Sequence, residues 1–333
     1  MKRYKLLNNV LGWVVFVIAA VTYILTLEST ASFWDCGEFI ASGYKLEVGH
    51  PPGNPIFMLT ARFFANFASS PSEVAYMVNL MSGLLSAATI LLLFWTITRL
   101  AQKIVLREGE TEETMSLGQM IAILGCGLVG ALAYAWSDTF WFSAVEGEVY
   151  AYSSFCTALV FWLILKWESV ADLPHANRYI ILIAYIIGVS IAVHLLNLLC
   201  IPAIVLVYYY RKYKNTDLKG SLIALLVSFV LIVLLLYGLV PGFVEVASWV
   251  ELLFVNVFHL PFNSGVVFYF FLIVGVIAWA IYETYAQRSD KLIKISFLIS
   301  IVLVGIPFIG DGYIIGIVLT AALAYYLFTR KKL

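Results

Sequence analysis

The segment between residues 33 and 57 concentrates ionisable side chains in a chain that is otherwise largely apolar. It contains Asp35, Glu38, Glu47 and His50. A carboxylate can act as a general base and take the proton from an attacking hydroxyl group, provided that it lies close to the substrate and is partly sheltered from water. This segment is therefore the first candidate for catalytic chemistry, with Glu47 the member most typical of a solvated carboxylate.

Asp35 and Glu38 can be interpreted in two ways. Side chains three residues apart lie on the same side of a helix, so both carboxylates would face one substrate. Asp35 could equally cap a short helix while Glu38 completes a capping box, and both residues would then be structural. The two interpretations are compatible, because a capping side chain is held in a fixed position.

His50 begins the sequence His-Pro-Pro-Gly-Asn-Pro. Each proline fixes its own backbone and forces the residue before it into an extended conformation, so we expect His50 to be held in one direction. A plain turn that returns the chain to the membrane surface is the alternative. Lys45 and Arg62 are cations close to this sequence, and they either balance the local carboxylates or hold a phosphate group.

Other polar residues stand at the ends of later apolar runs. Glu146 and Glu148 precede one run, where carboxylates favour a helix amino terminus, and this explanation is preferred for Glu146. Glu148 lies deeper, and an ionisable group at membrane depth is costly unless it is paired or lines a cavity. His194 and Asn197 either satisfy backbone groups at a turn or join the site, whereas Asp311, between two glycines, is typical of a turn.

The composition identifies the environment that must position these groups. Hydrophobic residues make up 62% of the chain and charged residues 12%, and the mean hydropathy is +0.96. A soluble domain carries about a quarter of its residues as charges. The fold class is therefore an all-α polytopic membrane protein.

Several apolar runs reach the roughly 20 residues that a spanning helix needs. Six of them fit one span each: 10–27, 74–98, 119–136, 148–165, 220–240 and 264–282. Two longer runs, 179–210 and 295–329, each fit two short helices that turn near His194–Asn197 and Gly310–Gly312. The predicted total is about ten spans.

The distribution of Lys and Arg supports this count, since cytoplasmic loops accumulate basic residues. With the amino terminus cytoplasmic, only Lys45 and Arg62 of the 20 Lys and Arg residues fall outside. One missed crossing would exchange sides for every later loop. The same orientation places the segment 33–57 on the outer face.

These features predict a single transmembrane domain over residues 1–333, with a first outer loop at about 28–73. The first apolar run resembles a signal peptide, but no small-residue cleavage site precedes polar sequence, so an uncleaved anchor is favoured. A loop of this length is expected to carry structure. Within it, residues 55–68 place Ile56, Leu59, Phe63 and Phe67 on one face, which predicts an amphipathic helix at the membrane surface.

Cysteine and charge patterns argue against several other classes. Cys36 has no second cysteine in the outer loop, and the other cysteines lie in predicted spans, so neither a disulfide framework nor a metal-binding spacing is present. Basic residues do not alternate with aromatic residues as in many nucleic-acid-binding proteins. We expect no metal, no cofactor and no nucleic acid, and the lipid bilayer as a partner.

Three segments carry a resemblance to a known family. They are WDCGEFI after the first span, GHPPGNPIF in the same loop, and EVY at the head of a later span. Together, in this order, they resemble glycosyltransferase family 117, the family of the domain of unknown function 2723. The resemblance covers roughly the first 210 residues.

The resemblance implies a membrane glycosyltransferase of the GT-C type, a hexosyltransferase that uses a polyprenyl-phosphate-linked sugar. It implies an acidic catalytic base in the first outer loop, most simply Asp35 with Glu38 beside it, and it draws His50 and Glu148 into the site. The expected reaction transfers a sugar, possibly mannose, to Ser or Thr of an exported protein. The expected location is a bacterial inner membrane.

Two other classes remain open, and members of the resembled family bear on one of them. A transporter or flippase for a lipid-linked or anionic solute would also explain Glu148 and His194, but its polar residues should gather at the membrane midplane, and here they gather in one outer loop. Many members are longer and carry a soluble carboxyl-terminal region. If such a region is missing here, an inactive membrane scaffold is the other alternative.

Overall fold

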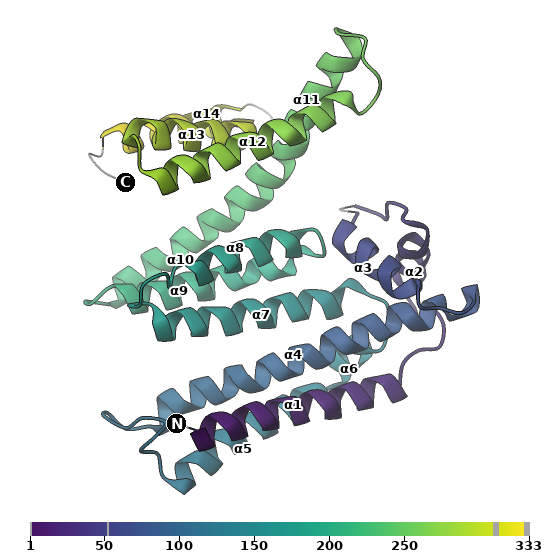
Figure 1. Cartoon of the computed structure of the whole chain (residues 1–333), viewed down its shortest axis with the longest axis vertical. Coiled ribbons are helices and arrows are strands. Elements are labelled where there is room, and N and C mark those ends of the chain that lie inside the picture. The colour runs from purple at the N-terminus through teal and green to yellow at the C-terminus, as the bar shows by residue number, and fades with distance from the viewer. Residues whose placement is uncertain (1, 52, 309–312, 330–333) are drawn as a thin grey trace. The chain divides into compact units, whose positions relative to one another are not determined.

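The structure is a computed structural model that describes residues 2–51, 53–308 and 313–329 (Figure 1). All regular elements in these ranges are helices, which confirms the all-α class. Seven helical segments of this part of the chain are long and apolar enough to cross a membrane. The predicted total of about ten spans is not confirmed, because three further apolar helices are shorter: Pro55–Ala65, Arg178–Ile191 and Ile314–Thr329.

The chain divides into two compact units, Met1–Ala224 and Leu225–Leu333. The division falls within helix α10 (Leu218–Val233). A single transmembrane domain over residues 1–333 stays a prediction. Every candidate site residue of the first outer segment, and the turns that pack against it, belongs to the first unit.

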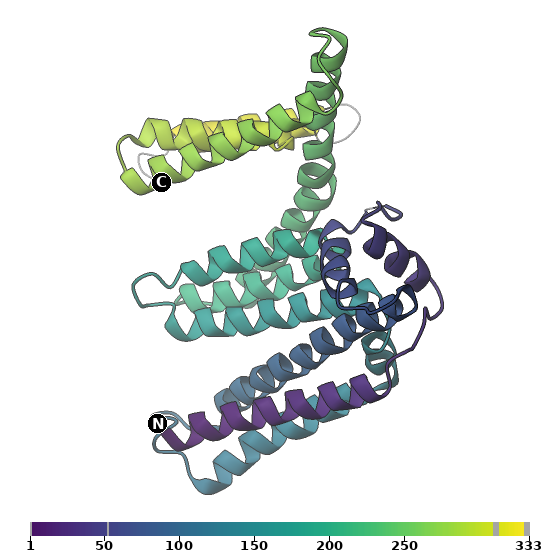
Figure 2. The ribbon, with the colours of Figure 1, turned by 45° about the vertical axis from the view of Figure 1, so that its right-hand side comes forward.

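The long helices of the first unit lie side by side and alternate in direction (Figures 1 and 2). Helix α4 is central, because it packs against α1, α5 and α7. The helices follow the predicted apolar runs closely: α1 (Lys2–Leu25), α4 (Val74–Val105), α5 (Leu117–Ala135), α7 (Val149–Val170), α8 (Arg178–Ile191) and α9 (Ile201–Lys212). The predicted turn in the run 179–210 is confirmed as a 3₁₀ segment, Leu195–Cys200, between α8 and α9.

Local sequence explains where some of these helices begin. The side chain of Ser116 accepts a hydrogen bond from the backbone N–H of Gln119, and Gln119 returns one to the N–H of Ser116. This capping box satisfies two free donors at the start of α5. Pro202 lies in the first turn of α9. A proline is tolerated there because the backbone N–H groups of the first turn have no acceptor within the helix.

Three short helices complete the first unit: α2 (Cys36–Lys45), α3 (Pro55–Ala65) and α6 (Asp138–Ala144). Helices α2 and α3 lie at one end of the long helices, and the amino terminus and the loop between α4 and α5 lie at the other (Figures 1 and 2). The segment between α1 and α4 is therefore helical and packed.

Helix α3 agrees with the predicted amphipathic helix but ends at Ala65, earlier than expected. Leu59 and Phe63, together with Phe67 beyond the helix end, are exposed as predicted. The opposite face buries Phe57, Met58 and Ala61 against α2 and α4. The helix therefore has two apolar faces, and only one of them is covered by protein.

The second unit contains the end of α10, a π-helical turn (Leu234–Leu239), α11 (Val240–Asn256), α12 (Ser264–Ala286), α13 (Asp290–Leu303) and α14 (Ile314–Thr329). The predicted span 220–240 is too short, because the helix continues through the π turn to Asn256. Pro241 in the first turn of α11 explains the irregularity, since a proline removes one backbone hydrogen bond. The predicted turn at Gly310–Gly312, with Asp311, lies outside the described residues.

Candidate active site

The backbone that leads into α2 is fixed by a buried amide of α4. Asn79 is fully buried, and its side-chain Nδ2 donates to the carbonyl oxygens of Glu28 at 2.7 Å and Thr30 at 3.1 Å. One face of α2, with Cys36 and Phe39, is buried in the same apolar cluster. Because this face points inward, Glu38, the carboxylate of α2, remains accessible on the other side.

Glu38 and His50 form a bidentate pair. Glu38 Oε1 accepts a hydrogen bond from the backbone N–H of His50 at 2.6 Å, and Glu38 Oε2 lies 3.1 Å from His50 Nδ1. The backbone hydrogen bond is the main reason why the pKa of Glu38 lies below its ordinary value. Glu38 is thus an ionised group that fixes His50, and its lowered basicity makes it a poor proton acceptor.

Glycine at position 49 makes this pair possible. A Cβ atom there would lie 3.2 Å from Glu38 Oε1 and 3.0 Å from the terminal carbon of Met58. The backbone N–H of Gly53 donates to the carbonyl of His50 at 2.8 Å and closes the turn that follows. His50 is held in one direction, as predicted, but by Glu38 and by this turn as well as by the proline after it.

Asp35 is the exposed carboxylate beside this pair. One ligand atom each from Asp35, Glu38 and His50 lies within 4.8 Å of the others. Asp35 occupies the position before α2 but accepts no capping hydrogen bond. The capping box considered from the sequence is therefore wrong. These three side chains could also bind one metal ion, although Glu38 and His50 already interact with each other.

Glu146 and Glu148 lie in the buried turn between α6 and α7, where they are 4% and 5% exposed. Glu146 bonds the side chain of Ser32 and is no helix cap, since α7 begins only at Val149. Burial, then the nearby Glu146, raises the pKa of Glu148 to about 7, and Asp35 also raises it. Glu148 is therefore a sheltered carboxylate electrostatically coupled to the exposed cluster.

The structure does not bring Lys45 and Arg62 into the cluster. Lys45 Nζ lies 4.0 Å from Glu47 Oε1, and both side chains are exposed. Arg62 donates to the backbone carbonyl of Tyr44, and its guanidinium lies 5.2 Å from the centre of the Tyr44 ring. Both cations therefore contact the carboxyl-terminal end of α2, whereas Asp35 precedes its first turn.

His194 and Asn197 have structural partners of their own. His194 Nδ1 accepts a hydrogen bond from the N–H of Leu196 at 3.2 Å, and burial lowers the pKa of the ring. Asn197 is 1% exposed and accepts a hydrogen bond from Thr157. The turn interpretation is thus confirmed for His194. The ring of Tyr150, two residues after Glu148, lies 5.5 Å from the His194 ring.

Several residues that build the site have no clear signal in the sequence. Asn79 is recognisable as an amide in an apolar run, but its acceptors lie about 50 positions away in the chain. Ser32 lies in a loop, and nothing in its sequence position indicates its contact with Glu146. Phe33 and Trp34, immediately before Asp35, are 78% and 89% exposed, and such aromatic groups suit contact with lipid or sugar.

Comparison with known proteins gives a consistent result. Residues 35–217 match the family described as protein O-mannosyl-transferase TMEM260 N-terminal domain. The chain is similar to protein O-mannosyl-transferase TMEM260 of Mus musculus, with 27% identity over 209 residues, which cover 63% of this chain and 27% of that protein. It is also similar to protein O-mannosyl-transferase tmem260 of Dictyostelium discoideum, with 23% identity over 189 residues, 55% of this chain and 20% of that protein.

The chain spans only about a quarter of the length of these curated relatives. No solved structure matches it. The family match begins at Asp35 and includes Glu38, His50 and Glu148.

Proposed function

Because the chain belongs to the family of the TMEM260 O-mannosyl-transferase N-terminal domain, we propose that it is the membrane domain of a glycosyltransferase of the GT-C type. Its donor is a polyprenyl-phosphate-linked sugar, with mannose the first candidate, and its acceptor is a Ser or Thr hydroxyl of an exported protein. The observation that carries the proposal is the convergence of Asp35, Glu38 and His50 within 4.8 Å beside the buried Glu148.

In the proposed reaction Asp35 is the general base. Its carboxylate takes the proton of the acceptor hydroxyl, while the hydroxyl oxygen attacks the anomeric carbon of the sugar. The bond between this carbon and the phosphate oxygen breaks, the configuration inverts, and polyprenyl phosphate leaves with the bonding electrons. Asp35 is free for this role because it accepts no capping hydrogen bond, and the bound substrates would have to shelter it from water.

The remaining residues bind and orient the substrates. The Glu38–His50 pair presents a fixed imidazole beside Asp35, and the proposed role of Glu148 is to bind a sugar hydroxyl. Lys45 and Arg62 are the cations of the same segment that would meet the donor phosphate, and cations there stabilise the negative charge that develops on the leaving group. Lys45 is 63% exposed and lies with Arg62 at the carboxyl-terminal end of α2, so contact with the phosphate requires the donor to extend from Asp35 to that end.

The proposed orientation has a cytoplasmic amino terminus and the site on the outer face. Support comes from the first unit, in which alternating helices place the amino terminus at one end and α2 and α3 at the other (Figure 1). A lipid-linked donor would keep its chain in the bilayer and present its sugar at this outer end. A bacterial inner membrane as the location stays a prediction.

The deciding experiment replaces Asp35 by Asn in the full chain, in membranes supplied with labelled polyprenyl-phosphate mannose and a Ser/Thr peptide. We expect transfer to fall by about 10²-fold or more, since positioned bases contribute about 10²–10⁴-fold. Asp138→Asn is the matched control, because Asp138 is an exposed carboxylate of the first turn of α6. Normal transfer by the Asp35 variant would remove Asp35 as the base, and no transfer by the parent chain would favour a scaffold.

A further inference from the structure

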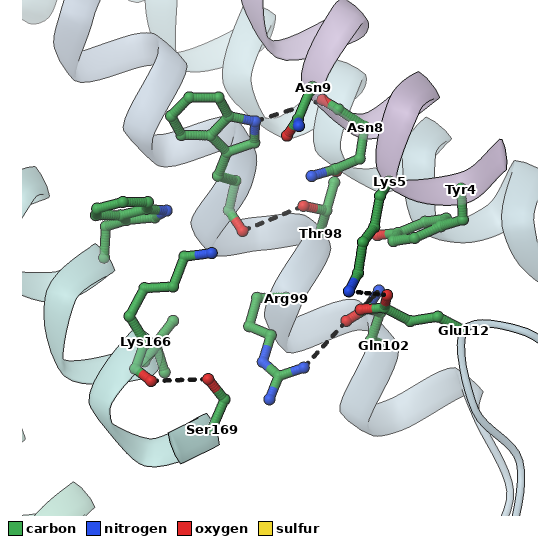
Figure 3. Close-up of a pocket in the computed structure, with 13 residues that line it drawn as sticks. Tyr4, Lys5, Asn8, Asn9, Thr98, Arg99, Gln102, Glu112, Lys166 and Ser169 are labelled. Carbon is green, nitrogen blue, oxygen red and sulfur yellow. Dashed lines mark hydrogen bonds and ion pairs between the residues drawn. The ribbon is translucent and has the colours of Figure 1, made fainter. Parts of the chain in front are cut away.

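A cavity lies far from the candidate active site, at the other end of the first unit (Figure 1). A cavity of about 440 Å³ opens where the amino-terminal turn of α1 meets the ends of α4 and α7, with Glu112 of the loop between α4 and α5 at its edge (Figure 3). This is the end of the first unit opposite α2 and α3 (Figure 1). The volume falls in the range of about 300–1,000 Å³ typical of small-molecule sites.

The lining of this cavity has an excess of cations from three helices. Lys5 of α1, Arg99 of α4 and Lys166 of α7 line it, and Glu112 is the single carboxylate among the lining residues. Glu112 Oε2 lies 3.5 Å from Lys5 Nζ and so neutralises only one of the three. The other two cations leave the cavity with a net positive charge.

Arg99 and Lys166 are available to an anion. Arg99 NH1 donates to Gln102 Oε1 at 3.3 Å, and its NH2 lies 3.8 Å from Glu168, a carboxylate outside the cavity that pairs more closely with Lys103. Lys166 Nζ lies 5.1 Å from the centre of the Trp162 ring, and no carboxylate of the described residues lies within ion-pair distance of it. Figure 3 shows both side chains beside the cavity, with the guanidinium of Arg99 turned toward Gln102.

The rest of the lining suits a molecule with an apolar end. The rings of Trp95 and Trp162 lie 5.9 Å apart and form an aromatic wall. Asn8 lines the cavity, and its buried Oδ1 has no hydrogen-bond donor among the described residues, so a turn of its side chain would offer this oxygen to a ligand hydroxyl. Tryptophan and basic residues together are typical of a membrane interface, where ammonium and guanidinium groups meet lipid phosphates.

We propose that this cavity binds the phosphate-bearing headgroup of an anionic lipid. The phosphate lies between Arg99 and Lys166, a headgroup or glycerol hydroxyl donates to Asn8, and the apolar part follows the indole wall. A free phosphate anion would make the same charge interactions but has no apolar part to contact the two indole rings. We therefore favour the lipid as the ligand. The site is independent of the transferase activity proposed above.

The test uses the purified full chain in detergent micelles, titrated with short-chain phosphatidylglycerol, with short-chain phosphatidylcholine and with inorganic phosphate. A ligand of the native state raises the thermal unfolding midpoint in proportion to its affinity. We expect phosphatidylglycerol to stabilise the protein most, and added salt to weaken the effect. Equal stabilisation by inorganic phosphate, or by phosphatidylcholine, would overturn the assignment to an anionic lipid.

Two double variants localise the effect. Arg99→Gln with Lys166→Gln should weaken phosphatidylglycerol binding at least about tenfold, since each basic residue near anionic lipid contributes on the order of a several-fold change. Lys214→Gln with Lys219→Gln removes the same charge from exposed positions outside the cavity and should change it little. Equal losses in both pairs would show general surface attraction and refute the site. Lys166→Gln alone, at an exposed position, serves if the first pair does not fold.

Discussion

At the scale of single residues, Glu148 makes stability depend on pH. Its pKa is raised from an ordinary 4.5 to about 7, chiefly by burial. Between these values the folded protein binds more protons than the unfolded chain, so the free energy of unfolding falls as the pH rises through this window and is then constant. Deprotonation is thus a cost to the folded state at neutral and alkaline pH.

Glu148→Gln should remove this dependence. We expect the variant to gain on the order of 1–3 kcal/mol relative to the parent chain at about pH 8, with no gain at about pH 5. Thermal unfolding in detergent at several pH values measures it. Glu47→Gln, at an exposed carboxylate, should keep the parent profile. A parent chain whose midpoint is the same at all these pH values would contradict the buried, coupled state of Glu148.

Gly49 offers a test of the Glu38–His50 pair. Gly49→Ala would place a Cβ 3.0 Å from the terminal carbon of Met58 and 3.2 Å from Glu38 Oε1, so these neighbours must shift by a few tenths of an ångström. We expect transfer to fall about tenfold or more while the chain still folds, because small displacements at a catalytic site are costly. Gly37→Ala is the control, since its Cβ would meet nothing nearer than 3.8 Å. Equal activity of the two variants would exclude a role for the pair.

The residue identities of the site could be read from the sequence in part. Asp35, Glu38 and His50 are close in the chain, so their grouping follows from local spacing and from the stiffness of the proline segment. The buried state of Glu146, the contact with Ser32 and the separation of Arg62 from the carboxylates could not be read, because they depend on how α2, α6 and α7 pack. Spacing predicts which groups are neighbours only over a short stretch of the chain.

At the scale of elements, the two hydrogen bonds from Asn79 of α4 to the backbone before α2, which we call the tether, hold these two parts of the chain together. Asn79→Ala would leave two backbone carbonyls without their donor, and we expect a loss of about 1–3 kcal/mol in the free energy of unfolding. Thermal unfolding measures the loss, and proteolysis before α2 should increase. Ser86→Ala is the control in the same helix, because the Ser86 hydroxyl is buried without a hydrogen-bond partner among the described residues. A larger loss for Ser86→Ala would contradict the tether.

The boundaries of the helices show what hydropathy can and cannot predict. The run at residues 119–136 corresponds to α5 within a few residues, and the run at 74–98 corresponds to α4 at its start, while α4 continues to Val105. An apolar run of this length forms a helix in a membrane, because a helix satisfies its own backbone hydrogen bonds. The hydropathy pattern does not predict that α10 continues into α11, because Gly238 and Pro241 are residues typical of a helix end. The π turn accommodates the backbone hydrogen bond that Pro241 cannot make, so the helix continues.

At the scale of the whole molecule, the distribution of charge predicts a sidedness that can be measured. Single cysteines introduced as Glu47→Cys and Lys214→Cys lie on opposite predicted sides, and both positions are exposed. In intact cells a membrane-impermeant maleimide should label the first and not the second, above the background of the parent chain. Labelling of Lys214→Cys alone would invert the orientation, and labelling of both would contradict a membrane barrier between these positions.

The central position of α4 also bears on biogenesis. Asn79 finds its acceptors, Glu28 and Thr30, in chain that the ribosome has already made, whereas α5 and α7 emerge later. The backbone before α2 can therefore be fixed while the nascent chain is still short, whereas the apolar cluster that buries Cys36 and Phe39 also needs Val149 and Val193. Glu148 lies in the turn just before α7. Asp35, Glu38, His50 and Glu148 can therefore come together only after the ribosome has made this turn.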